Sequence, residues 1–325
     1  MVKRLLVACV VVLGVGACAG SSSSSSSAPP STLLGNAAAT PTATATATAR
    51  PVSTVKSKPP PDYPRLLAAA FGPAAGGLVP VATWQGHPAA WLARSSSGVT
   101  LLTLDQRLLE LRLHSGTGDA GAVGWRYGPS VAGVERARLV AAFNGGFRLS
   151  VGAGGFMSYG RTAVPLRDGL GSVVTYAGGT TDVGAWQQEV PAPGRTVASV
   201  RQNLPLLVDH GRAAPTLDCL SCWGATLGGV IDPARSALGI TGNGRLVWAG
   251  GEHLTAAQLA SALVGSGVIR AVELDINPEW VAGYLYGHRG GHGPPAPVPV
   301  VPGQNGIPGA FLAAWSRDFF TVVAH

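Results

Sequence analysis

Short apolar runs separated by turns rich in glycine, proline and asparagine recur along most of the chain. Runs of this length between such turns are typical of β-strands. They predict successive strands over residues 89–94, 99–104, 108–114, 139–143, 172–176 and 181–186. In residues 108–114, leucines alternate with Arg112 and His114, so one face of that strand is expected to meet water.

A β-hairpin is predicted within residues 237–249, at the start of the most informative stretch of the chain, Arg235 to Trp280. Residues 237–240 and 246–249 are apolar and flank Thr241-Gly-Asn-Gly. Asparagine and glycine accept positive φ and are common in hairpin turns.

A helix and a buried strand follow the hairpin. Thr255 is a plausible N-cap, with Leu259 and Leu263 at helical spacing behind it and glycines from position 265 to end the helix. Residues 269–274 are then predicted to form a buried strand with Asp275 at its C-terminal end, a position from which a rigid scaffold presents a functional side chain.

The predicted fold class is a β-rich mixed α/β (α+β) domain, with mixed sheets and a few flanking helices. Residues 65–71 are predicted to form a short helix, and the glycine- and proline-rich residues 290–308 a surface loop. The apolar C-terminal residues 310–323 are expected to dock on the core.

The first 62 residues of the 325-residue chain differ from the rest. Lys3-Arg4, an apolar run and Val15-Gly-Ala-Cys18 resemble a bacterial lipoprotein signal over residues 1–17, with Cys18 lipidated; an ordinary secretory signal is the alternative. Residues 18–62 are rich in Ser, Thr, Ala and Pro and are expected to be a disordered tether. The folded domain is expected to span residues 63–325, outside the cytoplasm, with its motifs in 140–286.

Charge argues against nucleic acid as a partner. The chain has 23 Lys and Arg, of which five precede Asp62. From Asp62 onward there are 18 arginines and 16 acidic residues. Nucleic-acid binding needs clustered basic residues, which this near-balance does not provide.

Asn144, Gly145 and Gly146 follow the predicted strand 139–143 and form one candidate site. Adjacent glycines let the backbone take unusual φ and ψ values and approach a ligand, and asparagine offers both a donor and an acceptor. A simple strand-to-loop turn is the alternative interpretation.

Glu273 and Asp275 lie two residues apart and therefore on one strand face. Two carboxylates there could share acid–base work or hold a divalent metal. A salt bridge from Glu273 to a buried arginine is the alternative. The sequence requires no cofactor.

Cys219 and Cys222 are separated by two residues. Outside the cytoplasm, a local disulfide is the favoured interpretation. A redox pair would need a helix after the motif, and a zinc site would need further ligands such as His288 and His292.

The order of several motifs resembles the phosphodiester glycosidase family. These motifs are Asn144-Gly-Gly-Phe147, a later Leu-Pro-Leu-Leu-Val-Asp209, Arg235-Ser-Ala-Leu-Gly-Ile, and Leu274-Asp275. The family includes the enzyme that uncovers mannose 6-phosphate by removing N-acetylglucosamine from a phosphodiester. The resemblance implies that Asn144, Gly145, Gly146, Asp209, Arg235 and Asp275 lie near one pocket.

Asp275 and Arg235 supply, in principle, the groups for sugar-1-phosphodiester hydrolysis. A phosphate leaving group is a weak base, so a cation and one carboxylate are the main requirements. We therefore expect Asp275 to be the catalytic carboxylate, Arg235 the phosphate clamp, and Asn144 and the Gly pair the polar cradle. Phe147, Asn277 and Trp280 complete the expected substrate-binding set, with Trp280 a candidate to stack on a sugar.

The predicted function is an extracytoplasmic, membrane-anchored hydrolase of a sugar-1-phosphodiester in a cell-envelope or exported glycan. Many family members follow the aspartate with a glycine-rich Asp-Gly-Gly-Gly-Ser run, whereas this chain has Asp275-Ile-Asn-Pro-Glu-Trp280. That departure favours the alternative function, a non-catalytic glycan- or envelope-binding lipoprotein that keeps the fold.

Overall fold

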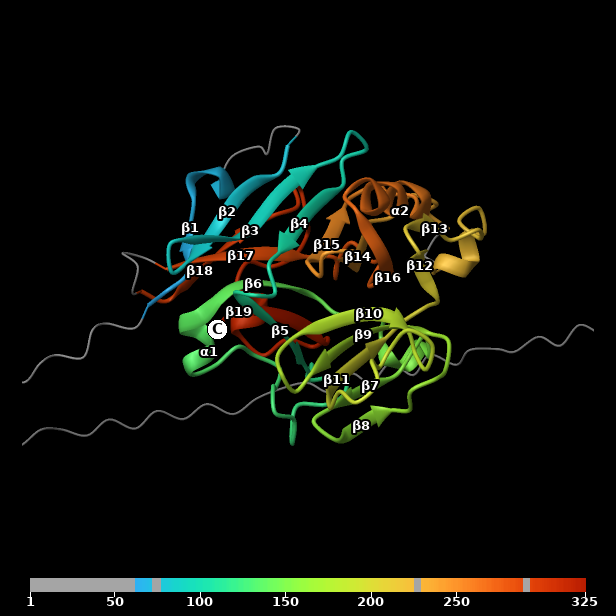
Figure 1. Cartoon of the computed structure of the whole chain (residues 1–325), viewed down its shortest axis with the longest axis horizontal. Helices are drawn as coiled ribbons and strands as arrows, with labels where there is room; N and C mark the ends of the chain where they lie inside the picture. The colour runs from blue at the N-terminus through green and yellow to red at the C-terminus, as the bar shows by residue number, and fades with distance from the viewer. Residues whose placement is uncertain (1–61, 72–76, 225–228, 289–292) are drawn as a thin grey trace, which may run out of the picture. The chain divides into compact units, whose positions relative to one another are not determined.

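The computed structural model describes residues 62–71, 77–224, 229–288 and 293–325. The predicted signal, the lipidation site at Cys18 and all of the tether before Asp62 lie outside these residues. The described residues form three β-sheets and two short α-helices (Figure 1), so the β-rich mixed class is confirmed. The strand ladders are antiparallel, and the two parallel pairings are isolated bridges, at Gly116–Ala120 and Trp186–Val190.

The largest sheet, called the β14 sheet here, has the strand order β1-β2-β3-β4-β15-β14-β16-β12-β13. Its strands are β1 (Arg65–Leu66), β2 (Val79–Trp84), β3 (His87–Arg94), β4 (Thr100–Leu104), β12 (Leu206–Asp209), β13 (Arg212–Ala213), β14 (Arg235–Thr241), β15 (Leu246–Gly251) and β16 (Val268–Glu273). The predicted hairpin is present as β14 and β15. The predicted strand 269–274 is present as β16, which ends at Glu273, one residue earlier than predicted.

A second sheet, the β6 sheet, brings together the middle and the end of the chain in the order β18-β17-β6-β19-β5. Its strands are β5 (Leu109–His114), β6 (Leu139–Asn144), β17 (Gly283–His288), β18 (Pro295–Pro299) and β19 (Phe319–Ala324). The C-terminal strand β19 lies between β5 and β6, so the predicted docking of the C-terminus is confirmed (Figure 1).

The third sheet, the β9 sheet, has the order β10-β9-β11-β7-β8. Its strands are β7 (Phe156–Ser158), β8 (Arg161–Val164), β9 (Gly171–Tyr176), β10 (Thr181–Ala185) and β11 (Val197–Gln202). One apolar core joins all three sheets, because Trp248 of β15, Phe143 of β6 and Val173 of β9 belong to the same cluster of buried side chains.

Helix α2 (Ala256–Gly265) packs on one face of the β14 sheet through Leu259 and Leu263. The predicted cap is confirmed as a capping box: Thr255 accepts from the backbone N–H of Gln258, whose side chain bonds back to the backbone N–H of Thr255. The other helix, α1 (Val134–Arg138), is short. None of the described helices is long and apolar enough to cross a membrane.

Three local predictions were wrong. Residues 65–71 begin with strand β1 and only then form a 3-10 helix, Ala68–Phe71, because residues 65 and 66 pair with β2. His114 does not face water: its ring is 1% exposed and contacts Glu135 and Gly128 O. Part of the expected surface loop 290–308 is strand β18, which pairs with β17.

Candidate active site

Asp275 is held in place on both of its carboxylate oxygens. Oδ1 accepts the backbone N–H groups of Ile276 and Asn277 at 2.8 and 3.0 Å. Oδ2 accepts from Arg317 Nη2 at 3.0 Å. The residue is 4% exposed, so this carboxylate sits at the end of β16 with a fixed orientation and little contact with water.

Arg317, which the sequence analysis missed, supplies the cation beside Asp275. Its guanidinium also donates to Asp119 and, at 3.0 Å, to the carbonyl oxygen of Gly146. It lies 5.1 Å from the centre of a ring of Trp280, and Arg317 is 6% exposed. The guanidinium is therefore fixed between two carboxylates and beneath an indole.

Asn144 joins the same centre from the end of β6. Its amide Nδ2 donates to Ser236 Oγ at 2.9 Å, and its Oδ1 accepts from the backbone N–H of Ala282. Ser236 Oγ in turn accepts the backbone N–H of Asp275 at 3.2 Å. The β6 and β14 sheets are thus linked by one polar network. We call Asn144, Ser236, Asp275, Arg317 and Asp119 the Asp275 centre.

The glycine pair has a packing role that the sequence did not suggest. A Cβ on Gly145 would lie 2.0 Å from Asp318 Oδ2, and one on Gly146 would lie 2.7 Å from Arg201 Cζ. Asp318 and Arg201 form a buried ion pair at 2.7 Å. Neither glycine has a positive φ. Both positions therefore require glycine because the Arg201–Asp318 pair packs directly against the backbone there.

Arg235 does not pair with Asp275. Its Nη1 donates to Glu273 Oε1 at 2.6 Å and to the carbonyl oxygen of Trp223, and its Nε donates to that of Leu254. Arg235 is 3% exposed. Glu273 therefore forms a salt bridge to a buried arginine, which was the alternative interpretation of this residue. Arg235 is enclosed by protein partners and does not face an open pocket.

Asp209 is not brought to the Asp275 centre. Antiparallel pairing of β12 with β16 places Val208 opposite Ala271, so Asp209 lies near the start of β16 and Asp275 beyond its end. The Asp209 side chain is 47% exposed and pairs with His210.

The other predicted binding residues do border the centre. The backbone N–H of Phe147 donates to Asn203 Oδ1, that of Asn277 donates to Asp275, and the Trp280 ring lies on Arg317. Asn203 also bonds through Nδ2 to the carbonyl oxygens of Glu273 and Leu274, which ties the end of β11 to β16.

Burial sets the protonation behaviour of the two carboxyls. Desolvation raises the pKa of Asp275 to about 6, although the charge of Arg317 and two backbone N–H groups lower it. Desolvation also raises the pKa of Glu273 to about 7, against the lowering effect of Arg235. Burial therefore moves the pKa of Asp275 toward neutral pH, the range in which acid–base groups are most effective.

Cys219 and Cys222 form a disulfide with Cα atoms 5.3 Å apart, so the favoured local interpretation is confirmed. This disulfide flanks the 3-10 helix Leu220–Trp223, whose last carbonyl accepts from Arg235. His292, one of the alternative zinc ligands, lies outside the described residues. Within those residues no group of three or more His, Cys, Asp or Glu side chains has the arrangement of a metal site.

The residues that sequence reasoning missed share a recognisable signal. Arg201, Arg317 and Asp318 are charged residues next to or within strongly apolar segments. A charged residue is fully buried in such a setting only if it has a partner, so these residues are candidates for buried ion pairs. The pattern does not say which charges meet.

Comparisons with known proteins give a distant fold-level similarity. No protein-family model matches the chain, and no curated protein does. The catalytic domain of zebrafish N-acetylglucosamine-1-phosphodiester alpha-N-acetylglucosaminidase, auto-inhibited by pro-peptide, is similar at 14% identity and a TM-score of 0.41, over 73% of this chain and 81% of that chain.

Two further solved structures are similar at the same remote level. A hypothetical protein from Synechocystis has 16% identity and a TM-score of 0.38, over 73% of this chain and 61% of that one. A putative exported protein from Burkholderia pseudomallei has 13% identity and a TM-score of 0.25, over 81% and 65%. The activity of this chain must therefore be argued from its own residues.

Proposed function

We propose that this protein is an extracytoplasmic hydrolase that cleaves a sugar-1-phosphodiester in a cell-envelope or exported glycan, anchored through a lipid on Cys18. The observation that carries the proposal is the Asp275 centre itself. A carboxyl whose pKa is raised to about 6 lies 3.0 Å from a guanidinium, at the meeting point of the Asn144 and Asp275 motifs. The order of those motifs along the chain supports the same reaction class.

In the proposed reaction, a water molecule attacks the anomeric carbon and the bond from that carbon to the phosphate oxygen breaks. Ionised Asp275 takes the proton from the water, and the products are a free sugar and a phosphate monoester. Arg317, in place of Arg235, is the cation that stabilises charge on the departing phosphate. Because the Trp280 ring lies on Arg317, that ring must shift before a phosphate reaches the guanidinium.

The test is hydrolysis of a panel of sugar-1-phosphodiesters by the purified full-length chain and its Asp275→Asn variant. We expect the variant to lose roughly 100-fold or more in kcat, the range for loss of an acid–base group. Since the ionised form of Asp275 is the active one, wild-type kcat/KM should rise with pH and level off above about 6.

Asp182→Asn is the matched control, because it removes a carboxylate that is ion-paired with Arg270 at 2.7 Å, away from the Asp275 centre. Its turnover should stay close to that of the wild type, and both variants should unfold cooperatively. Wild-type turnover by Asp275→Asn would remove Asp275 from the mechanism.

A specific observation favours a second function, non-catalytic binding of an envelope glycan. Both Arg235 and Arg317 are satisfied by protein partners and are 3% and 6% exposed. The Ile276-Asn277-Pro278 segment also replaces the glycine run of the family with a stiffer one. Binding of sugar phosphodiesters without turnover of any of them would support this second function over the first.

A further inference from the structure

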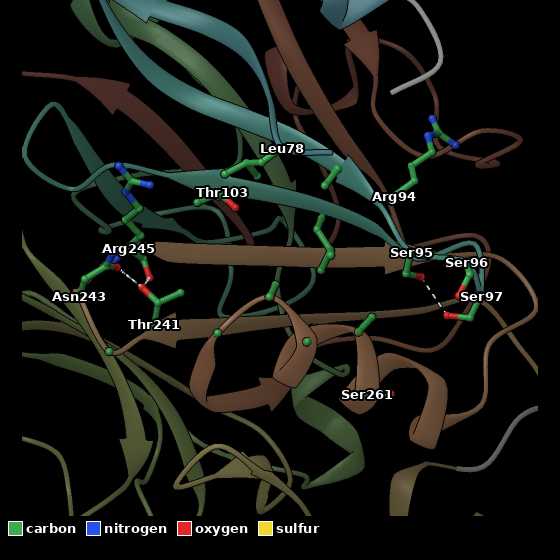
Figure 2. Close-up of a pocket in the computed structure, with 17 residues that line it drawn as sticks. Leu78, Arg94, Ser95, Ser96, Ser97, Thr103, Thr241, Asn243, Arg245 and Ser261 are labelled. Carbon is green, nitrogen blue, oxygen red and sulfur yellow. Dashed lines mark hydrogen bonds between the residues drawn. The ribbon is translucent and has the colours of Figure 1, made fainter. Parts of the chain in front are cut away.

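A cavity of about 790 Å³ lies on the face of the β14 sheet that carries α2 (Figure 2). Helix α2 packs mainly on β12, β13, β14, β15 and β16, and its apolar cluster reaches Leu101 of β4 and Ala93 of β3, beside which the cavity lies. The floor of the cavity includes Leu101 and Thr103 of β4, and the end of α2 with residues 266–267 forms one wall. We call this cavity the α2 groove.

The α2 groove is separate from the Asp275 centre. Strand register places Thr241, which lines the groove, opposite Val268 at the start of β16. The same register places Ala237 opposite Glu273, at the end of β16 that leads to Asp275. The two sites therefore lie at opposite ends of the β14–β16 pair, and a ligand in one does not occupy the other.

The lining of the groove is rich in small polar groups and carries no carboxylate among its residues, all of which are in the described part of the chain. Its hydroxyl and amide side chains are those of Ser95, Ser96, Ser97, Thr103, Thr241, Asn243, Ser261 and Ser266. Asn243 is exposed, and its Oδ1 accepts from Thr241 Oγ1 at 2.6 Å (Figure 2).

Arg245 supplies positive charge at one end of the groove. Its guanidinium is stacked 4.6 Å from the centre of a ring of Trp91, which pairs directly with Thr103 on the groove floor. The neighbouring carboxylate of Asp105 lies 3.9 Å away but is already bonded to Arg107 at 2.5 Å. The stack on Trp91 holds the guanidinium in place. The Arg245 side chain is 31% exposed, so its charge is accessible to a ligand.

Arg94 lines the same cavity but is oriented differently. Side chains alternate along β3, so Arg94 lies on the opposite face from Ala93, and its Nη2 is 3.5 Å from the carbonyl oxygen of Val300. Figure 2 shows it at the other end of the cavity from Arg245. Arg94 therefore serves as a charge-matched comparison for Arg245.

We propose that the α2 groove binds a sugar chain that carries an anionic substituent, with Arg245 on the anion and the hydroxyl and amide groups on the sugar. Sugar hydroxyls both donate and accept, as do the serine and threonine hydroxyls of the lining. A guanidinium that is stacked and pre-oriented binds phosphate or carboxylate with two parallel hydrogen bonds. The groove would hold a polymer whether or not the Asp275 centre cleaves it.

The test measures the Kd of the full-length chain for phosphorylated dextran, unmodified dextran and polyphosphate by calorimetry. The Asp275→Asn background is used so that turnover and binding are read separately. We expect Arg245→Gln to weaken binding of phosphorylated dextran about tenfold, the usual effect of losing a charge-assisted hydrogen bond, and Arg94→Gln to change it less than about twofold. Binding of unmodified dextran should be weaker and insensitive to Arg245→Gln.

A second pair of variants tests the groove by shape. Ser261→Trp places a large ring from an exposed helix position into the groove and should weaken binding of both dextrans. Ala257→Trp, at an exposed position of the same helix outside the lining, should leave both unchanged.

Three results would overturn the proposal. The first is that both Arg245→Gln and Ser261→Trp bind phosphorylated dextran as tightly as the wild type does. The second is that the wild type binds polyphosphate as tightly as phosphorylated dextran. The third is that the wild type binds neither dextran.

Discussion

Glu273 shows how a single buried residue can be ionically paired and still difficult to ionise. Oε1 accepts from Arg235 at 2.6 Å, whereas Oε2 is buried and has no hydrogen-bond partner within the described residues. Asp275 has hydrogen bonds on both oxygens, and burial nevertheless raises its pKa to about 6. An oxygen that has lost water without gaining a donor favours the protonated form, so desolvation outweighs the nearby guanidinium at Glu273.

Glu273→Gln should make the stability of the protein depend less on pH. Because burial raises the pKa of Glu273 from 4.5 to about 7, its stabilising contribution is complete below pH 4.5 and is lost as pH rises through 7. Wild-type free energy of unfolding should therefore fall over this window by up to roughly 3 kcal/mol on account of Glu273 alone. Urea unfolding at pH 4.5 and 7.5 measures it.

The readout is the difference between the two pH values, because any effect of the substitution that does not involve ionisation of residue 273 is the same at both. Glu279→Gln changes an exposed carboxylate and should leave the wild-type pH dependence intact. Identical slopes for Glu273→Gln and wild type would contradict the argument.

Among the elements, α2 and β18 show which local signals are sufficient. The cap at Thr255 and the apolar spacing of Leu259 and Leu263 predicted α2, since both act within a few residues of the chain.

Strand β18 has proline at every second position, a pattern that predicts a loop. Those prolines pair with Tyr284, Tyr286 and His288, at positions where a backbone N–H would point to the open edge of the sheet. Proline therefore removes no hydrogen bond to β17, and the residues between the prolines bond to β17.

Thr255→Ala should destabilise the protein by about 1 kcal/mol, the usual cost of losing an N-cap side chain. The Thr255 hydroxyl accepts the backbone N–H of Gln258, which otherwise has no partner within the first turn. Thr255→Ser keeps the hydroxyl and should behave like the wild type in urea unfolding. A Ser variant as unstable as the Ala variant would show that the methyl group, and not the cap, is responsible.

In the whole of the described domain, residues far apart in sequence are held together by β19. This strand pairs with β5 on one side and β6 on the other. Arg317 and Asp318 directly precede it and bond to Asp275 and Arg201. The C-terminal strand therefore closes the β6 sheet and delivers both charged residues to the polar network.

Removal of residues 319–325 should abolish cooperative folding, because it exposes the facing edges of β5 and β6 and deletes the buried side chains Phe319, Phe320 and Val322. Far-UV circular dichroism during thermal unfolding measures this. Removal of exposed His325 alone should leave a cooperative transition. A cooperative, wild-type-like transition after removal of residues 319–325 would refute the central role of β19.

The sequence by itself determined what depends on short stretches of chain. The hairpin of β14 and β15, the capped helix α2, the placement of Asp275 after a buried strand and the Cys219–Cys222 disulfide each follow from residues a few positions apart. Their physical basis is local: turn conformations, capping hydrogen bonds, side-chain periodicity and short-loop closure.

Only the tertiary structure decided which charges meet. Arg235 and Arg317 are both arginines beside buried strands, and nothing near either one in sequence says which carboxylate it contacts. Strand register gives Arg235 to Glu273, and the insertion of β19 between β5 and β6 brings Arg317 to Asp275, 42 positions earlier in the chain. Register and strand order are set by the packing of the whole domain, because one core joins all three sheets.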